Sequence, residues 1–360
     1  MLAVGRLLAG TALASNSGCD QGVQHDASSP APYLHVVASN VGPGKTLPPD
    51  GAVLLSFDRL LLPSTVIRQS VYLFDAFNVA LSPTVIYDPV TRIVTLGNPS
   101  SGEWLERGQP YKIVLAVPGS DTDDSNGLRA IDRATLDPAS DRVIPFFTDS
   151  TPAGTHGAPR IDFCTDVLPL FQQHCSASQC HGAAGPTTPN PRFPDGQSHP
   201  AAGLVLETTA GVVNTAIGLG ARRVAIGSNT GPRTAPQSPG RLFGLDVPLV
   251  DPRSPANSWL LYKLLIAPPP PPGTPPSVRR KCDGSPGTPP QDGFQPAVSY
   301  AVLSDGERAR LSDFIPGNVM PYPPDPGSDD RRENLTVGEV QRISTWIAQG
   351  APTSECACEP

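Results

Sequence analysis

The sequence predicts two folded parts of different class, an N-terminal all-β sandwich and a C-terminal, mainly α-helical part with long loops rich in proline and glycine. Short runs of β-branched and aromatic residues recur between turn signals over residues 32–150, which is typical of strands. Residues 161–360 instead contain apolar residues spaced three to four apart, which is typical of amphipathic helices. A chain of 360 residues is long enough for two such domains, and residues 151–160 are the expected linker.

Seven short strands are expected in the N-terminal part. They cover residues 34–37, 52–57, 71–74, 84–87, 92–96, 111–117 and 143–147. Residues 88–91 (DPVT) separate two of these runs and form a hairpin signal. This spacing of strands and turns favours an antiparallel sandwich.

Three motifs give this part a family resemblance. A Pro-Pro-Asp-Gly turn at 48–51 precedes the alternating segment LSF at 55–57, the segment LERGQPY at 105–111 precedes a long apolar strand, and DSNG at 124–127 follows it. In these motifs the stretch 32–150 resembles the bacterial Ig-like domains of S-layer and other surface proteins. The resemblance implies an Ig-like β-sandwich that spaces or displays another part and carries no catalytic residues.

Four helices are expected after the linker. The first covers residues 162–174, and the second begins at 254 or 257 and continues through 265. The third begins at 304–307, and the fourth runs from 336 towards 350. The last has the clearest signals, because Thr336 and Glu339 form a capping-box pair at its start. Gly350 suits a left-handed exit, and Pro352 cannot continue the helix.

The first 19 residues have the layout of an export signal, with one positive charge at Arg6 followed by a short run of apolar and small residues. Residues 12–14 (ALA) form one candidate cleavage site. The Ser-Gly-Cys sequence ending at Cys19 resembles the end of a bacterial lipoprotein signal, which implies a lipid on Cys19. Plain secretion is the alternative. Residues 20–31 are small and polar and are expected to form a tether to the membrane.

The chain has seven cysteines, and a lipidated Cys19 leaves six, an even number that suits an oxidising compartment. Cys356 and Cys358 are separated by one residue and are expected to pair elsewhere rather than with each other. Cys164 and Cys282 are the candidate partners.

The remaining two cysteines belong to the motif that carries chemistry. Cys175 and Cys180 are followed directly by His181, as in the haem attachment motif Cys-x-x-Cys-His, although four residues separate the cysteines here. By itself this motif leaves two possibilities, haem attachment and a local disulfide. A single methionine often fills a gap in the core, usually from an apolar helix face. Met320 instead lies in a loop rich in glycine and proline, which can present its thioether to an iron ion. His174 is expected to face solvent or to cap a helix end.

The order of these segments gives the second resemblance. An apolar helix (VLPLF, 167–171) leads into the Cys/His motif, a DPRSPANSWLL segment follows at 251–261, and Met320-Pro321 precedes a last helix that ends in WIAQGAP at 346–352. Residues 161–360 thereby resemble the cytochrome c-like domains of exported bacterial proteins. The resemblance implies one covalent haem c attached through Cys175 and Cys180, with His181 and Met320 as axial iron ligands.

The sequence therefore predicts an exported, lipid-anchored electron carrier that exchanges electrons with a redox partner protein, in the periplasm or at the cell surface. Two alternatives stay open: a disulfide-stapled surface or adhesion lipoprotein without haem, and a haem peroxidase-like enzyme in which Met320 is displaced. The net charge of −7 offers no basic face for nucleic acid. No Ser/His/Asp set or buried carboxylate pair gives a reason to expect a hydrolase.

Overall fold

The computed structural model describes twelve parts of the chain, and the elements below lie within them. These are residues 33–98, 102–119, 126–140, 142–152, 160–176, 181–182, 203–219, 248–270, 303, 305–315, 320–321 and 334–356. Residues 31–360 form one compact unit. The expected export signal (1–19) and tether (20–31), most of the linker, and Cys19, Cys180, Cys282 and Cys358 lie outside the described residues.

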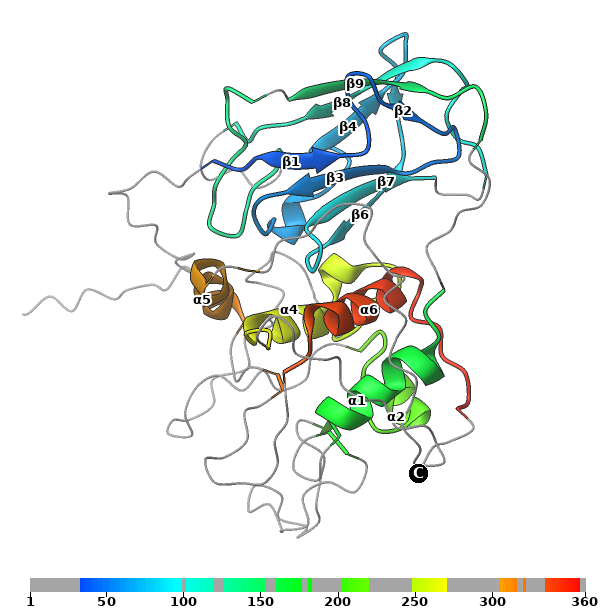
Figure 1. Ribbon diagram of the computed structural model, residues 1–360. Coiled ribbons are helices and arrows are strands. Elements are labelled where there is room, and N and C mark those ends of the chain that lie inside the picture. Colours follow the sequence, from blue (N-terminus) through cyan, green and yellow to red (C-terminus); the bar gives the residue numbers. More distant parts are fainter. Residues whose placement is uncertain are drawn as a thin grey trace, which may run out of the picture. The chain divides into compact units, whose positions relative to one another are not determined.

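Two β-sheets make up the N-terminal part and lie face to face (Figure 1). The strands are β1 (Val36–Ser39), β2 (Thr46–Leu47), β3 (Val53–Phe57), β4 (Val71–Phe74), β5 (Ala80–Leu81), β6 (Thr84–Asp88), β7 (Ile93–Gly97), β8 (Pro110–Leu115) and β9 (Val143–Thr148). One sheet has the order β1-β3-β7-β6 and the other β2-β9-β8-β4-β5.

Buried and more exposed residues alternate in β4 and β8. In β8, Tyr111, Ile113 and Leu115 are buried while the residues between them are partly exposed, as the two-residue period of a strand requires. The hairpin predicted at residues 88–91 is present, because β6 and β7 pair antiparallel in the register Asp88 to Ile93. Burial of one face of each sheet fixes this register, since a slip by one residue would expose the apolar set.

Two strands and one pairing differ from the sequence prediction. β2 and β5 have two residues each, too few to produce an alternating pattern, and β2 pairs in parallel with β9. The sheet is therefore mixed rather than purely antiparallel. Pairing between segments about a hundred residues apart depends on tertiary folding, so no local sequence pattern predicts it.

Helices and single turns follow the sheets. The elements are a π-turn η2 (Phe163–Val167), helices α1 (Leu168–His174) and α2 (Thr209–Thr215), a 3-10 turn η4 (Pro255–Asn257), and helices α4 (Trp259–Ile266), α5 (Asp305–Phe314) and α6 (Val337–Ala348). The capping box of α6 is formed as predicted, because the Glu339 amide donates to the Thr336 hydroxyl and the Thr336 amide donates to the Glu339 carboxylate. Helix α2 was not predicted.

Trp346 lies at the centre of the helical core. Its side chain is fully buried, and its ring centroid lies 5.5 Å from that of Phe163 and 6.1 Å from that of Phe171. Its indole N–H donates to the Pro352 carbonyl at 2.9 Å. A buried tryptophan needs such an acceptor, and this bond holds the segment after α6 against the core.

The turn between β6 and β7 contacts the helices directly. Val90 is buried in the same apolar cluster as α1, α4 and α6. The Ser344 hydroxyl of α6 donates to Asp88 at 2.7 Å, and Arg92 forms an ion pair with Glu307 of α5 at 3.0 Å. The strands and the helices therefore share a buried polar and apolar interface within this unit.

Of the helices in the described part of the chain, none combines the length and the apolar character needed to cross a bilayer.

Candidate functional site

The candidate site begins where α1 ends. Asp162 caps the preceding η2 turn by accepting from the Thr165 amide at 2.9 Å, and the chain then continues into α1. Phe171 faces the core, and its carbonyl accepts the Cys175 amide at 2.8 Å, which closes the last turn of the helix. Cys175 is thereby placed on the apolar cluster and is only 8% exposed.

The chain returns to the end of α1 at His181. The His181 amide donates to the Cys175 carbonyl at 2.9 Å, so these two residues lie close together at the end of α1. His181 is buried, at 6% exposed. Of the predicted attachment motif, the structure thus brings Cys175 and His181 together at one helix end. Cys180 falls outside the described residues.

A glycine follows His181, and the packing requires it. A Cβ atom at Gly182 would lie 2.6 Å from the Ser176 carbonyl oxygen, closer than real Cβ atoms approach backbone atoms. It would also lie 3.4 Å from a carboxylate oxygen of Glu207. The His181 turn is therefore packed between the end of α1 and the segment that leads into α2.

Met320 adjoins the same apolar cluster as Cys175 and is partly buried there. Its amide donates to the Lys263 carbonyl of α4 at 3.4 Å. Lys263 is itself buried, and desolvation lowers the pKa of its ammonium group to about 8. Met320 and Cys175 therefore contribute to one core from opposite ends of the helical sequence.

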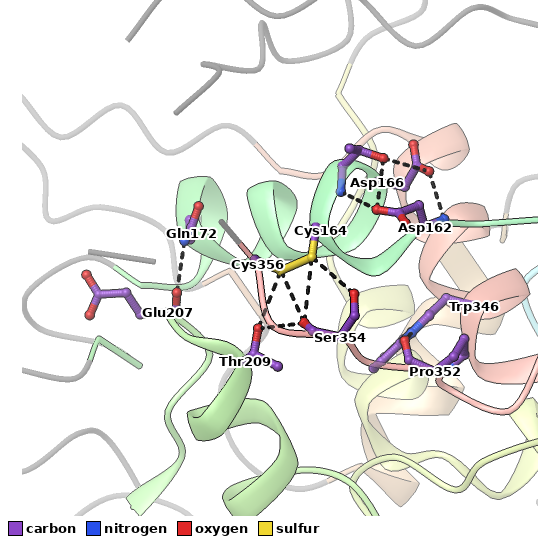
Figure 2. The surroundings of a disulfide bond; sticks show 11 residues. Asp162, Cys164, Asp166, Gln172, Glu207, Thr209, Trp346, Pro352, Ser354 and Cys356 are labelled. Atoms are coloured by element: carbon purple, nitrogen blue, oxygen red, sulfur yellow. Dashed lines mark hydrogen bonds between the residues drawn. A yellow bond between two sulfur atoms is a disulfide. The ribbon is translucent and has the colours of Figure 1, made fainter. Parts of the chain in front are cut away.

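A disulfide joins Cys164 of η2 to Cys356 in the segment after α6, with an S–S distance of 2.09 Å (Figure 2). The Thr209 hydroxyl of α2 donates to the Cys356 sulfur at 3.4 Å. These are two of the four cysteines predicted to form disulfides; Cys282 and Cys358 lie outside the described residues. The bond ties the beginning of the helical region to its end.

His174 is 3% exposed, so the predicted solvent contact is wrong. The other predicted position, at a helix end, agrees with its place in the last turn of α1. The segment 203–207 lies near this end of α1, because the Gln172 side-chain amide donates to the Glu207 carbonyl at 2.9 Å and the Leu206 amide donates to the His181 carbonyl at 2.8 Å. That segment is short and has no helical or strand period, so the sequence did not predict that the segment, or Glu207 within it, lies near the candidate site. The only signal was the glycine after His181.

An apolar pocket of about 40 Å³ lies elsewhere, between α4, α5 and the start of α6. Its lining residues are Val90, Leu264, Leu265, Ala267, Pro269, Leu303, Arg308, Leu335, Val337 and Val340. Space of this size holds one or two water molecules. None of Cys175, His181 and Met320 lines it, so this pocket is separate from the candidate site.

The described residues contain no group of three or more His, Cys, Asp or Glu side chains placed to share a metal ion. An iron bound by one imidazole and one thioether does not need such a group. Cys175 and His181, both buried at one helix end, are the described residues that could hold a haem beside its own histidine ligand. No model of a known protein family matches the sequence, and no curated protein matches it.

Proposed function

We propose that this chain is an exported electron-transfer protein that carries one covalent haem c. The observation that carries the proposal is the return of the chain from Cys175 to His181. A single hydrogen bond of 2.9 Å brings these residues together although the cysteine spacer is four residues long. The closeness of Cys175 and His181 supports the proposal, because haem attachment needs a cysteine and the histidine ligand near each other.

Each residue has a defined role in this proposal. The bound haem supplies a one-electron redox couple. Cys175 and Cys180 would attach the group to the chain, and His181 and Met320 would bind its iron. The buried position of His181 keeps bulk water away from the imidazole, and the apolar cluster beside Met320 favours a thioether over water.

Export is part of the proposal. The Cys164–Cys356 disulfide supports an oxidising compartment, because such bonds rarely persist in a reducing cytosol. A lipid on Cys19 would hold the body near a membrane through residues 20–31. The N-terminal sheets then serve as an Ig-like spacer between the membrane and the electron-transfer part, which meets its redox partner protein.

A pyridine haemochrome spectrum tests the proposal on full-length protein matured in a host that attaches haem c. We expect a covalent haem band in the wild type and its loss in the double variant Cys175→Ala/Cys180→Ala. Cys164→Ala is the matched control, since it removes a cysteine of the disulfide and should keep the band. Absence of the band in the wild type would overturn the proposal.

Met320 has its own test. A ferric haem with a methionine ligand has a weak charge-transfer band near the red edge of the visible spectrum, and Met320→Ala should abolish that band and lower the reduction potential. A wild type that contains haem, lacks the band and consumes peroxide would instead be a peroxidase-like enzyme with an open iron position.

The second candidate function is a surface or adhesion lipoprotein without haem. The observation that favours it is the Cys164–Cys356 disulfide, which staples the helical region without any cofactor. Mass spectrometry of non-reduced peptides discriminates the two functions. A Cys175–Cys180 disulfide in protein matured with haem available would support this candidate and exclude thioether attachment.

A further inference from the structure

The segment leading into α2 is held at two points, one on the His181 turn and one on α1. The Leu206 amide donates to the His181 carbonyl at 2.8 Å. The Gln172 side-chain amide, from α1, donates to the Glu207 carbonyl at 2.9 Å (Figure 2). The next residue, Thr208, caps α2 by accepting from the Gly211 amide. The backbone of Glu207 is therefore fixed relative to both α1 and His181.

This anchoring places the Glu207 carboxylate beside the candidate site. One of its oxygens lies 3.4 Å from the position that a Cβ atom would take at Gly182, the residue directly after His181. Glu207 is half-buried, so solvent screens its charge less than that of a fully exposed side chain. A negative charge is thus held one residue away from the proposed histidine ligand.

We propose that Glu207 lowers the reduction potential of the haem; this inference rests on the proposed function. Ferric haem carries one more positive charge than ferrous haem, so a fixed carboxylate nearby stabilises the ferric form more. The potential concerned is that of the one-electron reduction of ferric haem, in which the reduced partner protein would supply the electron. Glu207 forms no covalent bond to the haem and exchanges neither a proton nor an electron with it. It acts through the electric field at the site.

Spectroelectrochemical titration of the haem-loaded protein at one fixed pH tests the inference. Glu207→Gln removes the charge and keeps the shape, so its midpoint potential should be higher than that of the wild type. Glu207→Asp keeps the charge and should stay near the wild type. Glu103→Gln is the matched control, because Glu103 pairs with Arg107 in the N-terminal part and should leave the potential unchanged.

The outcomes separate this inference from the function on which it rests. A wild type without covalent haem overturns the proposed function and this inference with it. Haem present in both proteins, with equal potentials in the wild type and Glu207→Gln, overturns only the role of Glu207. Equal upward shifts in Glu207→Gln and Glu207→Asp also overturn it, because packing rather than charge would then be responsible. The potential is measured on loaded protein, so a lower haem yield in a variant does not affect the result.

Discussion

Gly182 has a steric role at the candidate site. The His181 turn passes so close to the end of α1 that a side chain at position 182 would meet the Ser176 carbonyl oxygen at 2.6 Å. Because that oxygen belongs to the backbone, it cannot rotate away as a side chain would. The position of His181 therefore depends on its neighbour having no Cβ.

Gly182→Ala should destabilise the protein by about 1–3 kcal/mol, the usual range for overpacking. Gly338→Ala is the matched control, since a Cβ at Gly338 in the first turn of α6 would have nothing within 4 Å. The control should be neutral or stabilising by up to ~1 kcal/mol, because alanine favours a helix over glycine. Urea unfolding measures both. Equal stability of the two variants would contradict the close packing of the His181 turn.

At the scale of elements, the turn between β6 and β7 depends on one carboxylate. Asp88 is half-buried and accepts from the Ser344 hydroxyl at 2.7 Å, the Thr91 hydroxyl at 3.0 Å and the Val90 amide at 2.9 Å. Burial raises the pKa of Asp88 above its ordinary value, because desolvation penalises the charged form more than these three donors stabilise it. The hairpin is therefore joined to α6 by a carboxyl group whose protonation state affects the stability of the fold.

The sign of the pH dependence follows from that shift. The folded protein holds the Asp88 proton more tightly than the unfolded chain, whose aspartate has the ordinary pKa of 3.8. This contribution to stability is present below the ordinary value and is lost as the pH rises through the raised value of the folded state. Asp88→Asn should remove that loss, and Asp75→Asn, in an exposed turn, should keep the wild-type profile. Free energies of unfolding against pH measure the difference, and parallel profiles for the wild type and Asp88→Asn would refute the expectation.

At the scale of the whole molecule, the disulfide closes a very long loop. Cys164 and Cys356 are separated by 192 residues, and the bond fixes the segment after α6 to the η2 turn. A cross-link between such distant residues removes more conformational freedom from the unfolded chain than from the folded one. Trp346 holds the same segment through its bond to Pro352, so the cross-link and the aromatic core act on one region.

Cys164→Ser should lower the free energy of unfolding by up to about 5 kcal/mol, the value of the chain-entropy model for a loop of this length. Denaturant unfolding with and without a reductant measures the effect. The wild type should lose stability when it is reduced, and most of this response should be missing from the variant. A variant as stable as the oxidised wild type would mean that the bond contributes nothing to the folded state.

Local signals were sufficient for most elements. The seven predicted strands match seven observed ones, and the capping box at Thr336 lies where the sequence predicted it. These features depend on residues a few positions apart, which is the range that periodicity and capping signals cover. The strands β2 and β5, the helix α2 and the burial of His174 depend on distant packing and were not predicted.

By itself, the sequence determined the β-rich N-terminal part, the start of α6, and Cys175 and His181 as residues of interest. Each of these depends on short-range sterics or on the chemistry of adjacent side chains. The tertiary structure alone decided that Cys164 pairs with Cys356, that the β6–β7 turn contacts α6, and that Glu207 lies beside the residue after His181. Such contacts join residues tens to hundreds of positions apart, and only the folding of the whole unit around its apolar cores specifies them.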